Sequence, residues 1–294
     1  MLTRIISISS NLLKFFYSFL RKNKIVTVSL TIISIIYPFV LIVLSWDEIK
    51  KIDQINISLI IFSIIFYLVS AIIQFLNWIL ILRRKFNYFK LDLKIYTQTI
   101  LMQRLPGGFW QWIGRIQLYN EKSSISAKRL LNSITYERIS LILSGGICYL
   151  FIVNRLIGIT GALFLISILA IWSKEKFSLG IHAILFSTFQ VVSYIICWVL
   201  GGIILWQITR VLVPLNFLSI IEAISIWSLT GSIGLILFFI PASLGIRELT
   251  LSAFLMPQFT FSETILISLF MRIIFFLADI ILVIISLLIS TNKK

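Results

Sequence analysis

Residues 104–115 read RLPGGFWQWIGR, and this stretch interrupts a long apolar run. Proline removes a backbone donor and glycine loosens a helix, so the residues PGG at 106–108 break any helix that enters them. Arg104 and Arg115 stand on either side, although an arginine in hydrocarbon costs roughly 2.5–3.5 kcal/mol. We therefore expect segment 92–120 to turn back on itself where protein shields irregular backbone and charge from lipid.

The composition around this stretch is typical of a helical membrane protein. Of 294 residues, 59% are hydrophobic and 13% are charged, and the mean hydropathy is +1.05. Apolar runs of about 20 residues recur, and each is long enough to cross a bilayer. The runs are continuous and do not alternate as they do in a β-barrel. The predicted fold class is all-α, a polytopic integral membrane protein.

We predict six spanning helices and two broken segments. The apolar runs that indicate spans are 25–45, 57–82, 130–153, 155–172, 181–206 and 263–288. Segments 92–120 and 216–258 are left over, and the second is broken at PASLG, which begins at Pro241. Residues 1–24 place apolar positions at helical spacing among basic ones, which predicts an amphipathic segment at the membrane surface. Residues 25–290 form a single transmembrane domain in this prediction.

Basic residues gather in alternate loops, and this sets the expected orientation. The stretches rich in Lys and Arg are 4–24, 83–94, 122–129, 174–176 and 293–294. Cytoplasmic loops carry such an excess, so we expect both termini in the cytoplasm and Lys50 to Asp53 outside. All the basic stretches fall on the cytoplasmic side only if each broken segment enters and leaves the membrane on the same side. Segment 92–120 would do so from the cytoplasm and segment 216–258 from outside. We therefore predict two re-entrant hairpins.

Two parts of the chain repeat one pattern. Each runs from a hairpin through a break to a span with a buried arginine: Arg138 follows Pro106 by 32 residues, and Arg272 follows Pro241 by 31. Three predicted spans separate the hairpins, an odd number, so the two repeats are inverted. Inverted repeats with broken helices in matching positions place a transport site near the membrane midplane. The halves centre near 92–153 and 216–288.

Ionisable residues and breaks in these apolar segments form the candidate binding site. The arginines suit a phosphate, because a guanidinium offers a planar fork of donors, and helix N-termini in the hairpins would add more. The alternative is that the charges only pair with each other, for example Arg272 with Asp279, and hold the bundle together. The candidate substrate-binding residues are Pro106, Gly107, Gly108, Arg115, Glu137, Arg138, Pro241, Gly245, Arg247, Glu248, Arg272 and Asp279.

Other classes of function find little support in the residue types. His182 is the only histidine, and Cys148 and Cys197 lie in apolar runs without a CxxC motif. We therefore expect no metal, no cofactor and no catalytic triad. The net charge of +15 reflects basic cytoplasmic loops, which argues against nucleic acid as a partner and favours contact with anionic phospholipid headgroups.

Glycine and tryptophan offer further expectations. Two pairs, Gly145-Gly146 and Gly201-Gly202, predict close helix packing. Two tryptophans next to the first break indicate either interfacial anchors or a stacking surface for a sugar or headgroup; they are Trp110 and Trp112.

At these residues the sequence resembles the lysylphosphatidylglycerol synthase transmembrane region family, also called flippase-like domain proteins. The resemblance extends from residue 25 to residue 290 and rests on LPGGFWQWIGR, YERISLI, FFIPASLGIRELTLSAFL and LFMRIIFFLADI, in this order. Arg247 has no assigned position in the family pattern. Residues that match it are Pro106, Gly107, Gly108 and Arg115 at the first break, Glu137 and Arg138 as the acid–base pair, and Pro241, Gly245, Glu248 and Arg272 in the second half.

The resemblance implies lipid transport. The best-known members of the family carry a cytoplasmic aminoacyl transferase domain, whereas this chain ends at Lys294 directly after the last predicted span. We expect no enzymatic activity but translocation of a phosphate-containing lipid or polyprenyl-linked glycolipid across the bacterial cytoplasmic membrane. Glycolipid or lipid-modifying enzymes are the expected partners. Two alternatives stay open: a membrane-embedded lipid-modifying enzyme, and an accessory protein of a cell-envelope glycolipid pathway.

Overall fold

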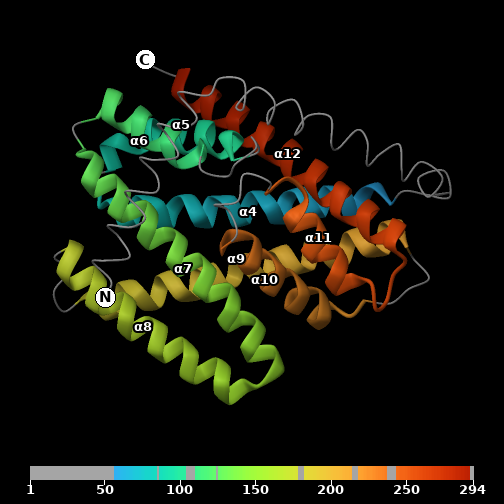
Figure 1. The fold of residues 1–294 in the computed structure, drawn as a ribbon. Helices are drawn as coiled ribbons and strands as arrows, with labels where there is room; N and C mark the ends of the chain where they lie inside the picture. Colours follow the sequence, from blue (N-terminus) through green and yellow to red (C-terminus); the bar gives the residue numbers. More distant parts are fainter. Residues whose placement is uncertain are drawn as a thin grey trace, which may run out of the picture.

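The computed structural model describes residues 56–84, 86–103, 110–123, 125–177, 182–213, 218–236 and 243–291. Within these ranges the secondary structure is entirely helical, as predicted (Figure 1). The helices are α4 (Ile57–Leu82), α5 (Phe89–Met102), α6 (Trp110–Lys122), α7 (Ala127–Val153), α8 (Arg155–Phe177), α9 (Ala183–Leu212), α10 (Ile220–Ile236), α11 (Ser243–Leu255) and α12 (Phe261–Thr291), with a short 3-10 turn at Phe86–Tyr88.

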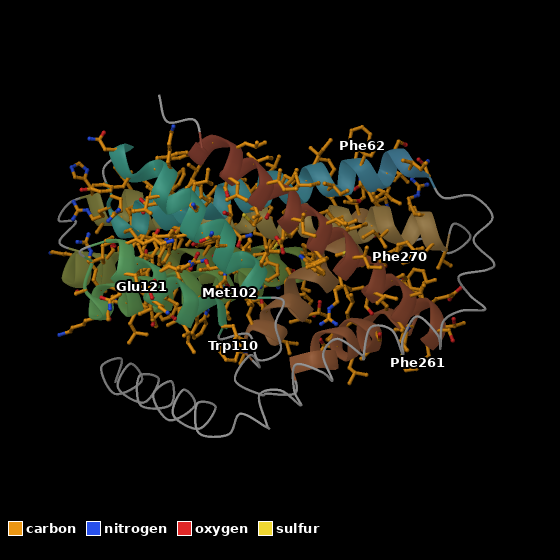
Figure 2. All side chains as sticks on the ribbon, turned by 90° about the horizontal axis from the view of Figure 1, so that it is seen from above. Phe62, Met102, Trp110, Glu121, Phe261 and Phe270 are labelled. Carbon is orange, nitrogen blue, oxygen red and sulfur yellow. The ribbon has the colours of Figure 1, made fainter. Side chains whose placement is uncertain are left out.

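Five of these helices are long and apolar enough to cross a membrane, namely α4, α7, α8, α9 and α12. They confirm five of the six predicted spans, while 25–45 and the amphipathic segment 1–24 lie outside the described residues. Apolar side chains cover their outer faces; on α4, Ile57, Ile61 and Ile65 recur every fourth residue, and neighbouring Phe62 also points outwards (Figure 2). Apolar faces of this extent suit lipid better than water. The architecture is that of a multi-pass membrane protein.

Each broken segment forms two short helices that pack together. In the first, Gly114 of α6 lies against Met102 and Thr99 of α5; in the second, α10 packs against α11. Helices of 13 and 14 residues are about 20 Å long, which is shorter than the hydrocarbon layer of about 30 Å. Each broken segment therefore contains two helices in contact within the described residues, and the re-entrant hairpins stay a prediction. The breaks themselves and the membrane side that each hairpin enters lie beyond what the described residues show.

The helix packing contains a repeat in which α4, α5, α6 and α7 correspond to α9, α10, α11 and α12. Exchanging each helix with its counterpart reproduces the same contacts. Helix α5 packs on α12 as α10 packs on α7, and α4 packs on α12 as α9 packs on α7. In both sets the first helix also contacts the second and the fourth. Helices α4 and α9 pack against each other at the centre of the bundle (Figure 1). Helix α8 bridges α7 and α9 and has no counterpart among the described helices.

Two hydrogen bonds between α4 and α9 show the same exchange at the level of residues. Ser63 Oγ donates to Gln207 Oε1 at 2.8 Å, and Asn77 Nδ2 donates to Ser193 Oγ at 2.8 Å. All four side chains are buried. The serines are 130 residues apart in the sequence and so are the carboxamides, so each bond maps onto the other. The pairing makes α4 antiparallel to α9, as repeats of opposite orientation require.

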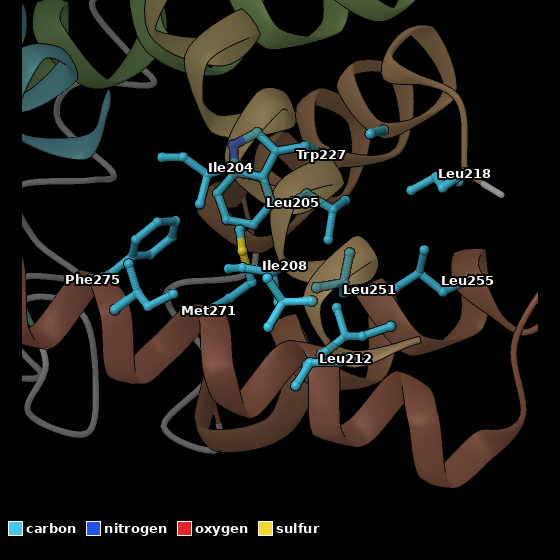
Figure 3. Packing of buried hydrophobic residues seen from close by; sticks show 14 of the residues in the cluster. Ile204, Leu205, Ile208, Leu212, Leu218, Trp227, Leu251, Leu255, Met271 and Phe275 are labelled. Carbon is cyan, nitrogen blue, oxygen red and sulfur yellow. The ribbon is translucent and has the colours of Figure 1, made fainter. Parts of the chain in front are cut away.

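A hydrophobic core fills the space between α9, α10, α11 and α12 (Figure 3). Small residues let these helices approach each other: Gly201 lies against the ring of Trp227, and Gly202 lies against the backbone of Ile224. Gly145 likewise lies against Trp198, but Gly146 faces open space, so the packing prediction is wrong for that glycine. The labelled core residues in the figure are Ile204, Leu205, Ile208, Leu212, Leu218, Trp227, Leu251, Leu255, Met271 and Phe275.

Candidate binding site

The centre of the candidate site is a buried ion pair between α6 and α7. Arg115 Nη1 donates to Glu137 Oε2 at 2.8 Å, and the two residues are only 1% and 5% exposed. Glu137 is the eleventh residue of α7, which places it about 15 Å along the helix axis. The sequence predicted both residues for the site, and the structure brings them into direct contact.

Aromatic rings and a hydroxyl hold the Arg115 guanidinium from neighbouring helices. Its Cζ lies 4.3 Å from the ring centroid of Trp78 on α4 and 4.7 Å from that of Tyr96 on α5. Cations over aromatic rings gain about 2 kcal/mol when water is excluded. Trp78 Nε1 in turn donates to Tyr119 Oη at 3.0 Å, and Arg115 Nε lies 3.4 Å from Thr99 Oγ1. Four helices, α4 to α7, therefore position this one side chain.

Arg138 follows Glu137 on α7 and reaches back to α6. Its Nη2 donates to Gln111 Oε1, and its Cζ lies 5.7 Å from the ring centroid of Trp112. Gln111 is buried and lies one helical turn before Arg115, so both side chains lie on the same face of α6. The ring of Trp112 thus packs beside the Arg138 guanidinium, and its roles as an interfacial anchor or as a stacking surface stay predictions.

Several buried polar atoms around the ion pair have no hydrogen-bond partner within the described part of the chain. Leaving such an atom unpaired costs about 1–3 kcal/mol, so water or a ligand normally satisfies it. Two of them are guanidinium donors, Arg115 Nη2 and Arg138 Nε, which are suited to an anion. Ser133 Oγ on α7, and Tyr194 Oη and both amide atoms of Gln190 on α9, are also unpaired among the described residues.

Helix α9 brings Gln190 and Tyr194 to the level of Glu137. The parallel register of α7 and α9 is set by the 3.5 Å contact between the hydroxyls of Tyr136 and Ser187 and by the 2.9 Å hydrogen bond from Trp198 Nε1 to the carbonyl of Leu141. Gln190 and Tyr194 lie between these two contacts, one helical turn apart. The site is therefore polar on its α9 side as well.

Two of the remaining predicted residues lie on α12. Asp279 is buried on α12 and accepts a 2.6 Å hydrogen bond from Tyr67 Oη on α4. Arg272 is half-buried two turns earlier on α12. Gly245, Arg247 and Glu248 belong to the first turns of α11, but their side chains are outside the described set, as are Pro106, Gly107, Gly108 and Pro241 altogether.

A separate ion pair lies outside the spanning segments, at the start of α5. Arg84 Nε lies 3.3 Å from Asp92 Oδ2, and the Arg84 guanidinium lies 4.0 Å from the ring centroid of Tyr88. Burial raises the pKa of the Asp92 carboxyl above its ordinary value, and the attraction of Arg84 opposes this rise. Asp92 was not predictable as a partner of Arg84, because one acid in a basic loop is unremarkable in a sequence.

Comparisons of the chain with protein-family models, with curated proteins and with solved structures found no match. The resemblance carried by the motifs therefore stays a prediction.

Proposed function

We propose that this protein translocates a phosphate-bearing lipid, or a polyprenyl-linked glycolipid, between the leaflets of the bacterial cytoplasmic membrane. The observation that carries the proposal is the buried Arg115–Glu137 ion pair with the half-buried Arg138 beside it, among apolar helices. Replacing a buried ion pair by apolar residues is often neutral or stabilising, so a bundle that only spans a membrane gains little from one. Ionisable groups at such positions usually serve a substrate or ion pathway.

The geometry of the cluster favours an anionic headgroup. Arg115 and Arg138 each keep a buried guanidinium N–H without a partner in the described residues, and phosphate oxygens accept such donors in forked geometry. Gln111 Oε1 accepts a hydrogen bond from Arg138 Nη2. A phosphate oxygen could replace this neutral amide oxygen as the acceptor. The apolar outer faces of the long helices suit the lipid tails, which would stay in the bilayer.

The arrangement of the helices supports transport over simple binding. The site lies where the α5–α6 hairpin meets α7, and the exchange of α4–α7 with α9–α12 relates this hairpin to α10–α11. Secondary transporters commonly place their substrates beside broken helices in inverted repeats.

The test is lipid exchange by the purified full-length chain in vesicles that contain a trace of fluorescent phosphatidylglycerol. A membrane-impermeant quencher added outside reports the fraction that has crossed. We expect protein-dependent exchange, and we expect Arg138→Lys to slow it about tenfold, because lysine keeps the charge but loses the fork. The matched control is Arg155→Lys, which changes an exposed arginine and should leave exchange unchanged.

Four other results would contradict the proposal. Exchange that needs no protein, or that survives Arg138→Lys in a normally folded sample, would remove the role of the cluster. Chemical conversion of the lipid would favour the enzyme alternative. The absence of both exchange and conversion would favour the accessory-protein alternative.

A further inference from the structure

We infer that Glu137 makes the site selective for a headgroup with a single negative charge, that is, a phosphodiester and not a phosphomonoester. This inference rests on the proposed function and specifies its substrate. It follows from the charges that the structure places in contact: Arg115 and Arg138 each carry one positive charge, and Glu137 carries one negative charge. The cluster has a net charge of +1.

Burial makes this charge count matter. Arg115 is 1% exposed and Glu137 is 5% exposed, so water screens the cluster poorly and charges interact strongly. One negative charge from a ligand brings the cluster to neutrality. A second negative charge would leave it net negative and would lie beside the Glu137 carboxylate, and like charges in such proximity disfavour binding strongly.

Within the described ranges, the groups around Glu137 do not alter this count. Among the described residues, Tyr96 of α5 and Tyr194 of α9 face it closely enough to interact electrostatically, and both phenols are neutral near physiological pH. Helices α4, α8 and α10 also pack on α7, and in the described ranges they bring no acid or base into hydrogen-bonded or ionic contact with Glu137.

The unpaired atoms show where the ligand charge would be received. Arg115 Nη2 and Arg138 Nε are buried guanidinium nitrogens without a partner in the described residues. Glu137 and Thr99 lie at Arg115 Nη1 and Nε, and Gln111 accepts from Arg138 Nη2. A phosphodiester has two unesterified oxygens, one for each donor. Glu137 thus has a specificity-determining role. It neutralises one of the two arginine charges, so that one negative charge from the ligand balances the other.

The experiment compares fluorescent phosphatidylglycerol, a phosphodiester, with fluorescent phosphatidic acid, a phosphomonoester, in the vesicle assay at mildly alkaline pH. Phosphatidic acid then carries close to two charges, because the second ionisation of a phosphomonoester lies near pH 6 to 7. We expect the wild-type chain to move phosphatidylglycerol at least about tenfold faster. Glu137→Gln removes one negative charge at nearly constant shape, and we expect it to shift the preference toward phosphatidic acid.

The control substitution is Glu121→Gln, which makes the same chemical change at an exposed position on α6 and should keep the wild-type ratio. A second measurement needs no variant: in the wild type, exchange of phosphatidic acid should rise as the pH falls and the lipid loses its second charge, while exchange of phosphatidylglycerol stays level.

The outcomes separate the two proposals. Equal exchange of both lipids by an active wild-type chain, or an unchanged ratio in Glu137→Gln, would overturn the charge selectivity and leave the transport function standing. A wild-type chain that moves neither lipid would overturn the transport function and this inference with it.

Discussion

Gly202 controls how closely α9 and α10 approach each other. A Cβ on Gly202 would overlap the backbone of Ile224, whereas a Cβ on Gly146 would meet no atom within 4 Å. We expect Gly202→Ala to lower the free energy of unfolding by about 1–3 kcal/mol, because overpacking forces the helices apart. Gly146→Ala should leave it unchanged or raise it by up to about 1 kcal/mol. Thermal unfolding of the two detergent-solubilised variants measures the difference, and equal stability would contradict the packing described here.

Two carboxyls outside the spanning segments should respond to pH in opposite directions. Burial raises the pKa of the Asp92 carboxyl from its ordinary value of 3.8, against the opposing pull of Arg84. The pKa of Glu222 is lowered, because Glu222 accepts hydrogen bonds from the backbone N–H and side chain of Ser219. Because the pKa of Asp92 is raised, ionisation of Asp92 destabilises the folded state. Because the pKa of Glu222 is lowered, ionisation of Glu222 stabilises the folded state.

The prediction compares Asp92→Asn with Glu222→Gln. At neutral pH we expect Asp92→Asn to unfold at a higher temperature than the wild type, with the difference shrinking as the pH falls towards the ordinary value of 3.8. Glu222→Gln should unfold at a lower temperature, and its deficit should also shrink on acidification, because the wild-type carboxyl becomes protonated. Melting temperatures across this pH range check both signs. An Asp92→Asn variant that is less stable at neutral pH would show that the Arg84 contact outweighs burial.

The sequence predicted the charged members of the site but not their partners. Arg115, Glu137 and Arg138 were predictable because ionisable residues are rare in apolar runs. Gln111 and Trp78 were not, since an amide or an indole in a helix is ordinary. The position of Gln111 one turn before Arg115 was the only available signal. Which arginine takes the carboxylate depends on how α6 lies against α7, and local periodicity contains no information about that.

At the level of helices, hydropathy located the elements well and their ends poorly. Helix α7 begins at Ala127, capped by Ser126 Oγ, which accepts from the Arg129 backbone N–H, whereas the prediction began at residue 130. Helix α9 extends to Leu212, beyond the predicted end at 206. In both cases polar residues continue the helix past the apolar run, because backbone hydrogen bonding does not stop where lipid does.

The α4–α9 contact offers a test of the repeat. Asn77→Ala and Gln207→Ala each remove the carboxamide partner of a buried serine, so both should lower stability by about 1–3 kcal/mol. Because the two bonds are equivalent under the exchange, the losses should agree within about 0.5 kcal/mol. Gln117→Ala, on the exposed face of α6, is the control and should change little. Chemical or thermal unfolding of the three variants provides the comparison, and a large effect at only one of the buried sites would argue against equivalent roles.

For the molecule as a whole, the orientation in the membrane is the next property to establish. The basic loops predict both termini in the cytoplasm and residue 52 outside. In a background with Cys148→Ala and Cys197→Ala, which removes two buried thiols, Ile52→Cys should react with an impermeant maleimide added outside. Lys122→Cys, at the end of α6, should react only from the cytoplasmic side. Labelling in the reverse pattern would invert the topology, and labelling of both from one side would contradict the re-entrant first hairpin.

The paired hydrogen bonds between α4 and α9 have a mechanical consequence. Ser63 and Asn77 are 14 residues apart, so the two bonds lie about 21 Å apart along α4. Separating α4 from α9 at one end would break one of these hydrogen bonds and leave the other as a pivot. Since both are serine–carboxamide bonds worth about 1 kcal/mol each, tilting costs nearly the same in either direction. These two bonds therefore favour neither end of the α4–α9 contact for separation.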